Sequence, residues 1–186
     1  MVLVFILTQV GYTQTKTSGR FGKKEAVAVV ARVMGKVEIV RTGTVNAAPA
    51  RGGDFLYEGD MIKTGRSGRG IILYVHGAET KLNGDTEMII GEPAPQDKKV
   101  KLKKGQIWTR SLGAIGGVRA KVTVVTPVAI VGVRGTIFDT TVDGDTGDTG
   151  VYVYEGAVTV GNEFGTVEVN AGQKTNIGSG EAPNKP

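Results

Sequence analysis

The 186-residue chain contains no cysteine and only one histidine, His76. Without cysteine it cannot form disulfide bonds, a thiol nucleophile, cysteine-ligated zinc or a lipidated lipoprotein amino terminus. One histidine is too few for the common zinc sites, and no serine stands in the sequence context of a nucleophile elbow. The glycine-rich phosphate loops of nucleotide-binding proteins are also missing. We therefore expect a protein that is not an enzyme and that holds neither a metal nor a cofactor.

The chain also lacks a long apolar run. Residues 1–13 carry a short apolar burst, which is far below the ~20 residues that span a bilayer. The burst is similar to the hydrophobic part of a secretory signal that has lost its basic start. We therefore predict a signal-peptide-like remnant at residues 1–13, a polar linker at 14–24 and a periplasmic or secreted protein. An ordinary first strand is the alternative for the burst.

The 29 glycines are interleaved with valine and isoleucine, and they leave no glycine-free window of about 15 residues in which a long helix could form. Valine and isoleucine suit a pleated strand. A phrase of the form x-Gly-x-apolar recurs at Gly35, Gly105, Gly156 and Gly172, which suggests similar turns stacked on one another. This pattern predicts one all-β domain over residues 25–178, solenoid-like or rolled, with a β-sandwich as the alternative. Residues 179–186 are predicted to be a disordered tail.

The segment 126–138 is an apolar run rich in β-branched residues, and it contains a single cation, Arg134. A guanidinium inside an apolar strand needs a partner, because a lone buried charge is very costly. Glu155 and Asp60 lie in other glycine-turn motifs and are the candidate partners in a structural ion network. The alternative is that Arg134 faces outward and anchors a ligand.

Lys99, Lys101 and Lys103 alternate with apolar residues and therefore predict an exposed basic face. The simplest interpretation is the solvated side of an edge strand, where lysines prevent unwanted strand pairing. Contact with an acidic partner or an envelope glycan is the alternative. Nucleic-acid binding would bring stacking aromatics into the patch, and only Trp108 is near, so we expect no nucleic-acid partner.

An acidic, glycine-containing stretch occupies residues 143–148. Oxygen-rich turns of this kind can hold calcium. The stretch nevertheless departs from the EF-hand loop, because its fifth position is Gly147 and its twelfth is Tyr154 rather than a glutamate. We therefore expect an ordinary exposed hairpin turn here.

Several short motifs follow one another in an order that resembles the FecR domain family. They are Gly59-Asp60, Ile62-Lys63-Thr64-Gly65, Gly105-Gln106-Ile107, Thr126-Pro127, Val133-Arg134-Gly135-Thr136 with Phe138, Glu155-Gly156 and Ala171-Gly172-Gln173. The resemblance spans roughly residues 27–177. It implies an all-β domain of β-helical character. FecR-like proteins typically relay the occupancy of an outer-membrane iron–siderophore receptor to a sigma factor through a periplasmic segment.

Complete regulators of this kind join a cytoplasmic anti-sigma segment, a membrane helix, the β domain and a carboxy-terminal receptor-contact module. The sequence contains the β domain without a spanning segment, so we expect a free-standing FecR-type domain of the bacterial envelope. Its expected partner is a protein or a cell-wall polymer. The alternatives are a structural β scaffold that adds strands from a partner, a glycan-binding module, or an enzyme with two carboxylates facing a glycan cleft.

Overall fold

The computed structural model describes residues 25–75, 77–93, 97–111 and 121–186. Every element of secondary structure in these residues is a β-strand. The strands are β1 (Ala28–Met34), β2 (Val37–Val40), β3 (Ala47–Pro49), β4 (Phe55–Leu56), β5 (Met61–Thr64), β6 (Arg69–Tyr74), β7 (Ala78–Leu82), β8 (Glu87–Pro93), β9 (Asp97–Ser111), β10 (Lys121–Val125), β11 (Ile130–Arg134), β12 (Ile137–Val142), β13 (Thr149–Glu155), β14 (Ala157–Asn162), β15 (Gly165–Asn170) and β16 (Lys174–Ile177).

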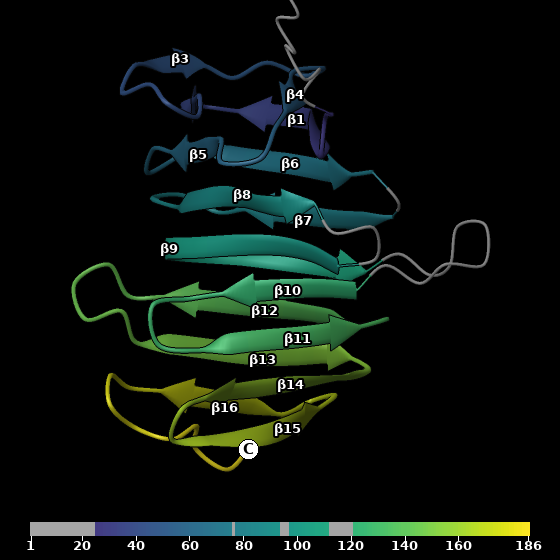
Figure 1. The fold of residues 1–186 in the computed structure, drawn as a ribbon, viewed down its shortest axis with the longest axis vertical. Coiled ribbons are helices and arrows are strands. Elements are labelled where there is room, and N and C mark those ends of the chain that lie inside the picture. The colour runs from purple at the N-terminus through teal and green to yellow at the C-terminus, as the bar shows by residue number, and fades with distance from the viewer. Residues whose placement is uncertain (1–24, 76, 94–96, 112–120) are drawn as a thin grey trace, which may run out of the picture.

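The strands form one continuous sheet that folds back on itself into two layers (Figure 1). Layer A has the order β4-β1-β6-β7-β9-β12-β13-β16, and layer B has the order β3-β2-β5-β8-β9-β10-β11-β14-β15. Most pairs are antiparallel, but β9 and β10 are parallel. The strands stack from β3 and β4 at one end of the molecule to β15 and β16 at the other. The sequence prediction of an all-β, rolled domain is therefore confirmed.

The layers are joined within β9, the one described strand that belongs to both. Its first half pairs with β8 and β10 in layer B, and its second half, from Gly105 onward, pairs with β7 and β12 in layer A. Gly105 has a φ of 91°, a backbone conformation that side-chain-bearing residues rarely adopt. A Cβ at this position would also lie 2.6 Å from the Cα of Thr86. Glycine therefore permits the strand to turn from one layer into the other.

The core lies between the layers and consists mainly of valine, isoleucine and leucine. In most strands alternate side chains are buried, as in β6 and β16, because successive residues of a strand point to opposite faces. Phe138 is the largest fully buried side chain. Most strands thus give one side to a common core and keep the other for the outer surface.

One sequence prediction about the position of a segment is wrong. The lysine-bearing strand is not an edge strand, because β9 lies in the middle of the stack with partners on both sides. The tail at residues 179–186 contacts the body of the domain, since Pro183 is buried and the Thr175 hydroxyl donates to the Asn184 carbonyl at 2.6 Å. The Asn162 amide donates to the Glu181 carbonyl at 2.6 Å. These contacts close the C-terminal end of the stack.

The predicted signal remnant and linker at residues 1–24 lie outside the described residues and stay predictions. In the part of the chain that the structure describes, no helix has the length and hydrophobicity needed to cross a bilayer.

Candidate functional site

The outer face of layer A carries two rows of side chains that run across the strands. In each row, neighbouring residues are direct register partners. The first row is Phe55, Val29, Leu73, Glu79, Arg110, Ile137 and Glu155. The second row is Ile71, Lys81, Trp108, Asp139, Tyr152 and Lys174. The outer face is therefore apolar near the N-terminal end of the stack and becomes polar and aromatic toward the C-terminal end.

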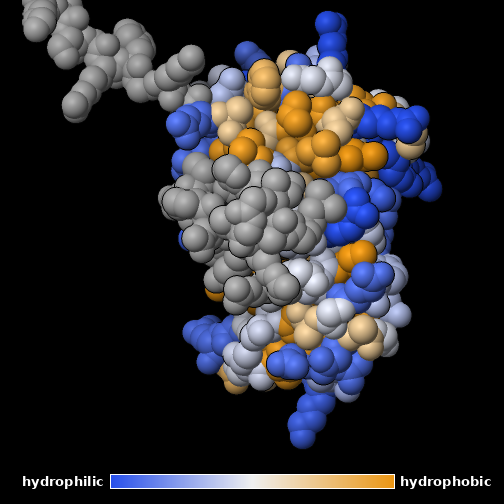
Figure 2. Space-filling view, turned by 90° about the vertical axis from the view of Figure 1, so that its right-hand side faces the viewer, coloured by the Kyte–Doolittle hydropathy of each residue, from blue (hydrophilic) through white to orange (hydrophobic). Residues whose placement is uncertain are grey.

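The apolar part, which we call the apolar row, consists of Val29, Phe55, Leu73 and the adjacent Val75. Phe55 is 58% exposed and Val75 is 46% exposed. Figure 2 shows hydrophobic side chains gathered over the end of the stack to which β1, β4 and β6 belong. Contiguous exposed apolar residues with a polar rim are typical of surfaces that contact a partner.

The rim of the apolar row is made of charged side chains. The Arg110 guanidinium donates to the Glu79 carboxylate at 3.0 Å, and Lys81 Nζ lies 3.6 Å from the other oxygen of the same carboxylate. Lys81 Nζ also lies 4.1 Å from the centre of the Trp108 ring, within the range of a cation–π contact. These contacts hold long side chains flat against the sheet and leave the face accessible.

The polar and aromatic part surrounds a shallow hollow of about 230 Å³. The Tyr154 hydroxyl donates to Asp139 Oδ2 at 2.7 Å, and Gln106 Nε2 donates to the same oxygen at 3.2 Å. The hydrogen bond to Asp139, with a smaller effect of burial, raises the pKa of Tyr154 to about 12. The Tyr152 ring meets the Tyr154 ring edge to face, with 4.8 Å between centroids. The two tyrosines are therefore held in fixed positions on the face.

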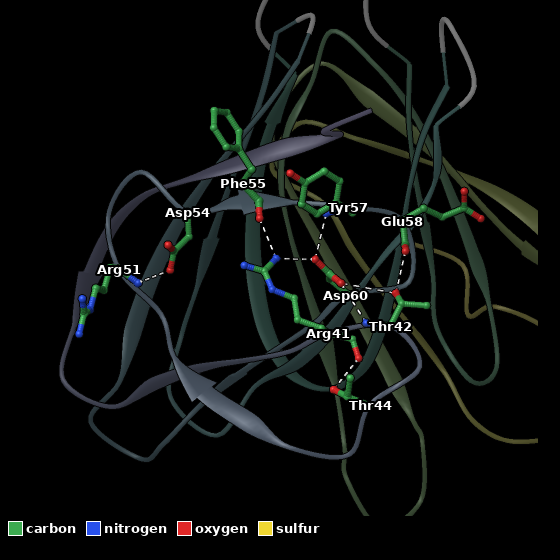
Figure 3. Close-up of polar contacts among 9 residues, drawn as sticks. All are labelled: Arg41, Thr42, Thr44, Arg51, Asp54, Phe55, Tyr57, Glu58 and Asp60. Atoms are coloured by element: carbon green, nitrogen blue, oxygen red, sulfur yellow. Dashed lines mark hydrogen bonds and ion pairs between the residues drawn. The ribbon is translucent and has the colours of Figure 1, made fainter. Parts of the chain in front are cut away.

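Asp60 lies elsewhere, in a dense polar cluster near the N-terminal end of the stack (Figure 3). Its buried carboxylate accepts hydrogen bonds from the backbone N–H groups of Thr42 and Tyr57, both at 3.0 Å. Arg41 Nη1 lies 2.7 Å from Asp60 Oδ2 and donates to the Phe55 carbonyl at 2.7 Å. One carboxylate thus ties together the turn after β2, β4 and the start of β5. The arrangement is structural, because the carboxylate is surrounded by its own chain.

Arg41 was not predicted from the sequence as the cation of Asp60. The two residues are 19 positions apart and share no spacing signal. The side chain of Arg134 lies outside the described residues, so its predicted ion network stays a prediction. Glu155 is exposed at the end of β13, and its Cα is the register partner of Ile137, three residues after Arg134.

The basic face formed by Lys99, Lys101 and Lys103 is exposed on the outer side of layer B. The hairpin turn predicted at residues 143–148 is present between β12 and β13. Asp143 Oδ1 accepts hydrogen bonds from the N–H groups of Asp145 and Thr146, both at 2.9 Å, and these bonds lower the pKa of Asp143. That carboxylate therefore stabilises its own loop. His76 lies outside the described residues.

Comparison with known proteins now defines the class. The model of the FecR protein family matches residues 60–159, which is more than half of the chain. The chain therefore belongs to the FecR family. No curated protein matches the sequence.

Two crystal structures of a candidate anti-sigma factor from Parabacteroides distasonis ATCC 8503, at 2.50 and 1.65 Å resolution, have a similar fold. Each shares 18% sequence identity with this chain at a TM-score of 0.56, and the match covers 66% of this chain and 56% of the other. At this identity the likeness concerns the fold alone, and this chain spans little more than half of those proteins. Family and fold together support a signalling or regulatory role.

Proposed function

We propose that this protein is a non-catalytic signalling domain of the bacterial envelope that acts through contacts with a protein partner. The observation that carries the proposal is the exposed apolar row on the outer face of layer A. Membership of the FecR family supports a role in signalling. The export signal predicted from residues 1–13 supports a place in the envelope.

The apolar row has the composition of a protein–protein contact. Specific interfaces have an apolar centre, in which aromatic residues are enriched, and a polar rim. Phe55 and Leu73 flank Val29 in register, so the three side chains form a continuous strip. Glu79 and Arg110 continue the same row as an ion pair. A partner that covers the strip would bury apolar surface at about 25 cal/mol per Å², and the charges would fix its orientation.

The partner that fits best is a component of a sigma-factor signalling system. The two similar solved structures are described as a candidate anti-sigma factor. FecR-like proteins typically relay a signal from an outer-membrane iron–siderophore receptor, as the resemblance to that family implies. In our proposal, the receptor or a regulator coupled to it docks on the apolar row.

The test compares capture of partners from envelope extracts by the wild-type chain and by Leu73→Ser combined with Phe55→Ser. Val45→Ser is the matched control, because Val45 is 94% exposed and lies outside the apolar row. We expect the double variant to lose a receptor or sigma-system protein, identified by mass spectrometry, that the control retains. Equal capture by all three proteins would contradict the proposal.

A structural scaffold that adds strands is the second candidate, favoured by the edge of β15. This six-residue strand pairs only with β14 among the described strands and carries one charge, Glu168. The other terminal strands are protected against pairing with a further strand. β4 has only two residues, β3 contains Pro49, and the Asn184 N–H donates to the Asn176 carbonyl of β16. If the protein is such a scaffold, its chains should associate with one another as the protein concentration rises, which light scattering would measure. A monomer at every concentration would contradict a scaffold that forms by self-association.

A further inference from the structure

The hollow on the outer face of layer A has two exposed aromatic walls. Tyr152 is 38% exposed and Tyr154 is 47% exposed, and their rings meet at 78°. The bond from the Tyr154 hydroxyl to Asp139 fixes the second ring, so little side-chain freedom is lost when a ligand binds. Tyrosine rings offer a flat apolar face together with a polar edge. The walls therefore suit a ligand that has an apolar face and polar edges of its own.

The polar groups of the hollow have unused hydrogen-bonding capacity. Both bonds that Asp139 accepts from described side chains go to Oδ2, which leaves Oδ1 as an open acceptor. The exposed Asn176 carboxamide forms no side-chain hydrogen bond with any described residue, and it offers two donors and an acceptor. The carboxylate accepts hydrogen bonds and the carboxamide both accepts and donates them, so together they can bind the hydroxyl groups of a ligand.

The charge of the hollow favours a neutral ligand. The lining contains one carboxylate, Asp139, and one ammonium group, Lys174. A charged ligand of either sign would be repelled by one of these groups and attracted by the other, so the cost of desolvating its charge would not be offset. At Gly150 the space of a side chain is taken by neighbours, because a Cβ there would lie 2.6 Å from Thr141 Oγ1 and 3.3 Å from Asn176 Oδ1. Glycine at this position therefore allows the polar side chains of the hollow to lie close together.

We propose that this hollow binds a neutral sugar residue of an envelope polysaccharide. The apolar face of the sugar ring lies against Tyr152, its hydroxyls donate to Asp139 Oδ1, and further hydroxyls exchange hydrogen bonds with Asn176. The site is separate from the apolar row, and the proposal does not depend on protein docking there. Binding to a fixed polymer would hold the signalling domain at a set place in the envelope.

The test uses the fluorescence of Trp108, the only tryptophan, whose Cα is the register partner of Asp139. The probes are maltotriose and the trimer of N-acetylglucosamine, and the charged comparisons are trigalacturonate and the trimer of glucosamine. We expect saturable binding of at least one neutral probe, with a Kd of about 1 mM, as suits a shallow open site. We expect at least about fivefold weaker binding of both charged probes, because a fivefold change corresponds to about 1 kcal/mol.

Three variants locate the binding site. Tyr152→Ala and Asp139→Ala should each weaken binding by about fivefold or more, since each removes about 1 kcal/mol of ring or hydrogen-bond contact. Phe164→Ala is the matched control, because Phe164 is an exposed aromatic (54%) in the β14–β15 turn, outside the hollow. Circular dichroism would establish that each variant is folded, and if Tyr152→Ala is not, Asp139→Ala decides. Absence of neutral-sugar binding, equal binding of charged probes, or unchanged binding by the decisive folded variant would overturn the proposal.

Discussion

Alanine substitutions at two glycines can separate backbone strain from steric crowding in this fold. Gly105 has a φ of 91° and Gly172 a φ of 81°, so both lie in the region that disfavours side chains. Their surroundings differ. A Cβ at Gly172 would meet nothing within 4 Å, whereas a Cβ at Gly105 would lie 2.6 Å from the Cα of Thr86 and contact its hydroxyl. Gly172→Ala is therefore the control for Gly105→Ala.

The expected magnitudes follow from these differences. Alanine in a left-handed conformation costs about 1–2 kcal/mol, and the loss of glycine flexibility in the unfolded chain offsets about 0.4–1 kcal/mol. Gly172→Ala should therefore destabilise the protein by about 1 kcal/mol. At Gly105 the methyl group must also displace backbone, and such overpacking adds about 1–3 kcal/mol. We expect Gly105→Ala to cost about 3 kcal/mol in total.

Thermal unfolding followed by Trp108 fluorescence measures both effects, because Trp108 lies on β9 three residues after Gly105. At about 2–4 °C per kcal/mol, the Tm should fall by about 3 °C for Gly172→Ala and by about 9 °C for Gly105→Ala. Equal shifts would refute the reasoning. They would show that β9 can pass between the layers without the close approach to Thr86.

Three further predictions concern charged and polar groups. Asp60→Ala should lower the free energy of unfolding by about 3–5 kcal/mol, because it leaves buried backbone donors without an acceptor. Arg41→Ala should lower it by about 1 kcal/mol, because it leaves no buried donor unpaired. Equal losses of stability in denaturant unfolding would show that the ion pair alone matters. In NMR titrations, Tyr154 should titrate near 12 and return toward 10 in Asp139→Ala. The neutral Tyr154 hydroxyl stabilises the folded state below pH 10, and this contribution is lost as the pH rises from about 10 to about 12. If the pKa of Tyr154 is unchanged in Asp139→Ala, the hydrogen bond to Asp139 is not the cause of the shift. Replacing Lys99, Lys101 and Lys103 together with serine should change the free energy of unfolding by no more than about 0.5 kcal/mol. A larger loss in calorimetry would show that these side chains contribute to the fold.

The turns of this fold could be predicted from sequence because they depend on local chemistry. All four glycines of the recurring phrase have positive φ, between 66° and 91°. Alternation of apolar and polar residues likewise gave the exposed side of β9. The alternation does not predict where β9 lies in the sheet. It indicates which face of the strand meets solvent, but it does not depend on which strands pair with β9 on its two sides. The pairings of β9 with β7 and β12 join segments far apart in the chain.

The candidate site could not be read from sequence for a related reason. Val27, Ala28, Val29 and Val30 are all apolar, so the pattern does not tell which of them face outward. The apolar row arises only when β1 lies between β4 and β6, which brings Val29 beside both Phe55 and Leu73. The cluster around Asp60 likewise depends on long-range pairing.

A single core between two layers has a consequence for how function can be distributed. Most strands give one side to the core, so their outer side is free of packing constraints and can differ between layers. In layer B the outer side of β9 carries the basic face, while in layer A the outer side is apolar and aromatic. Because the core and the full thickness of the sheet separate the two faces, a partner on one leaves the other open. A domain of this shape can therefore contact separate partners on its two outer faces, and substitutions in the apolar row or the hollow, both on layer A, should leave contacts of the basic face on layer B unchanged.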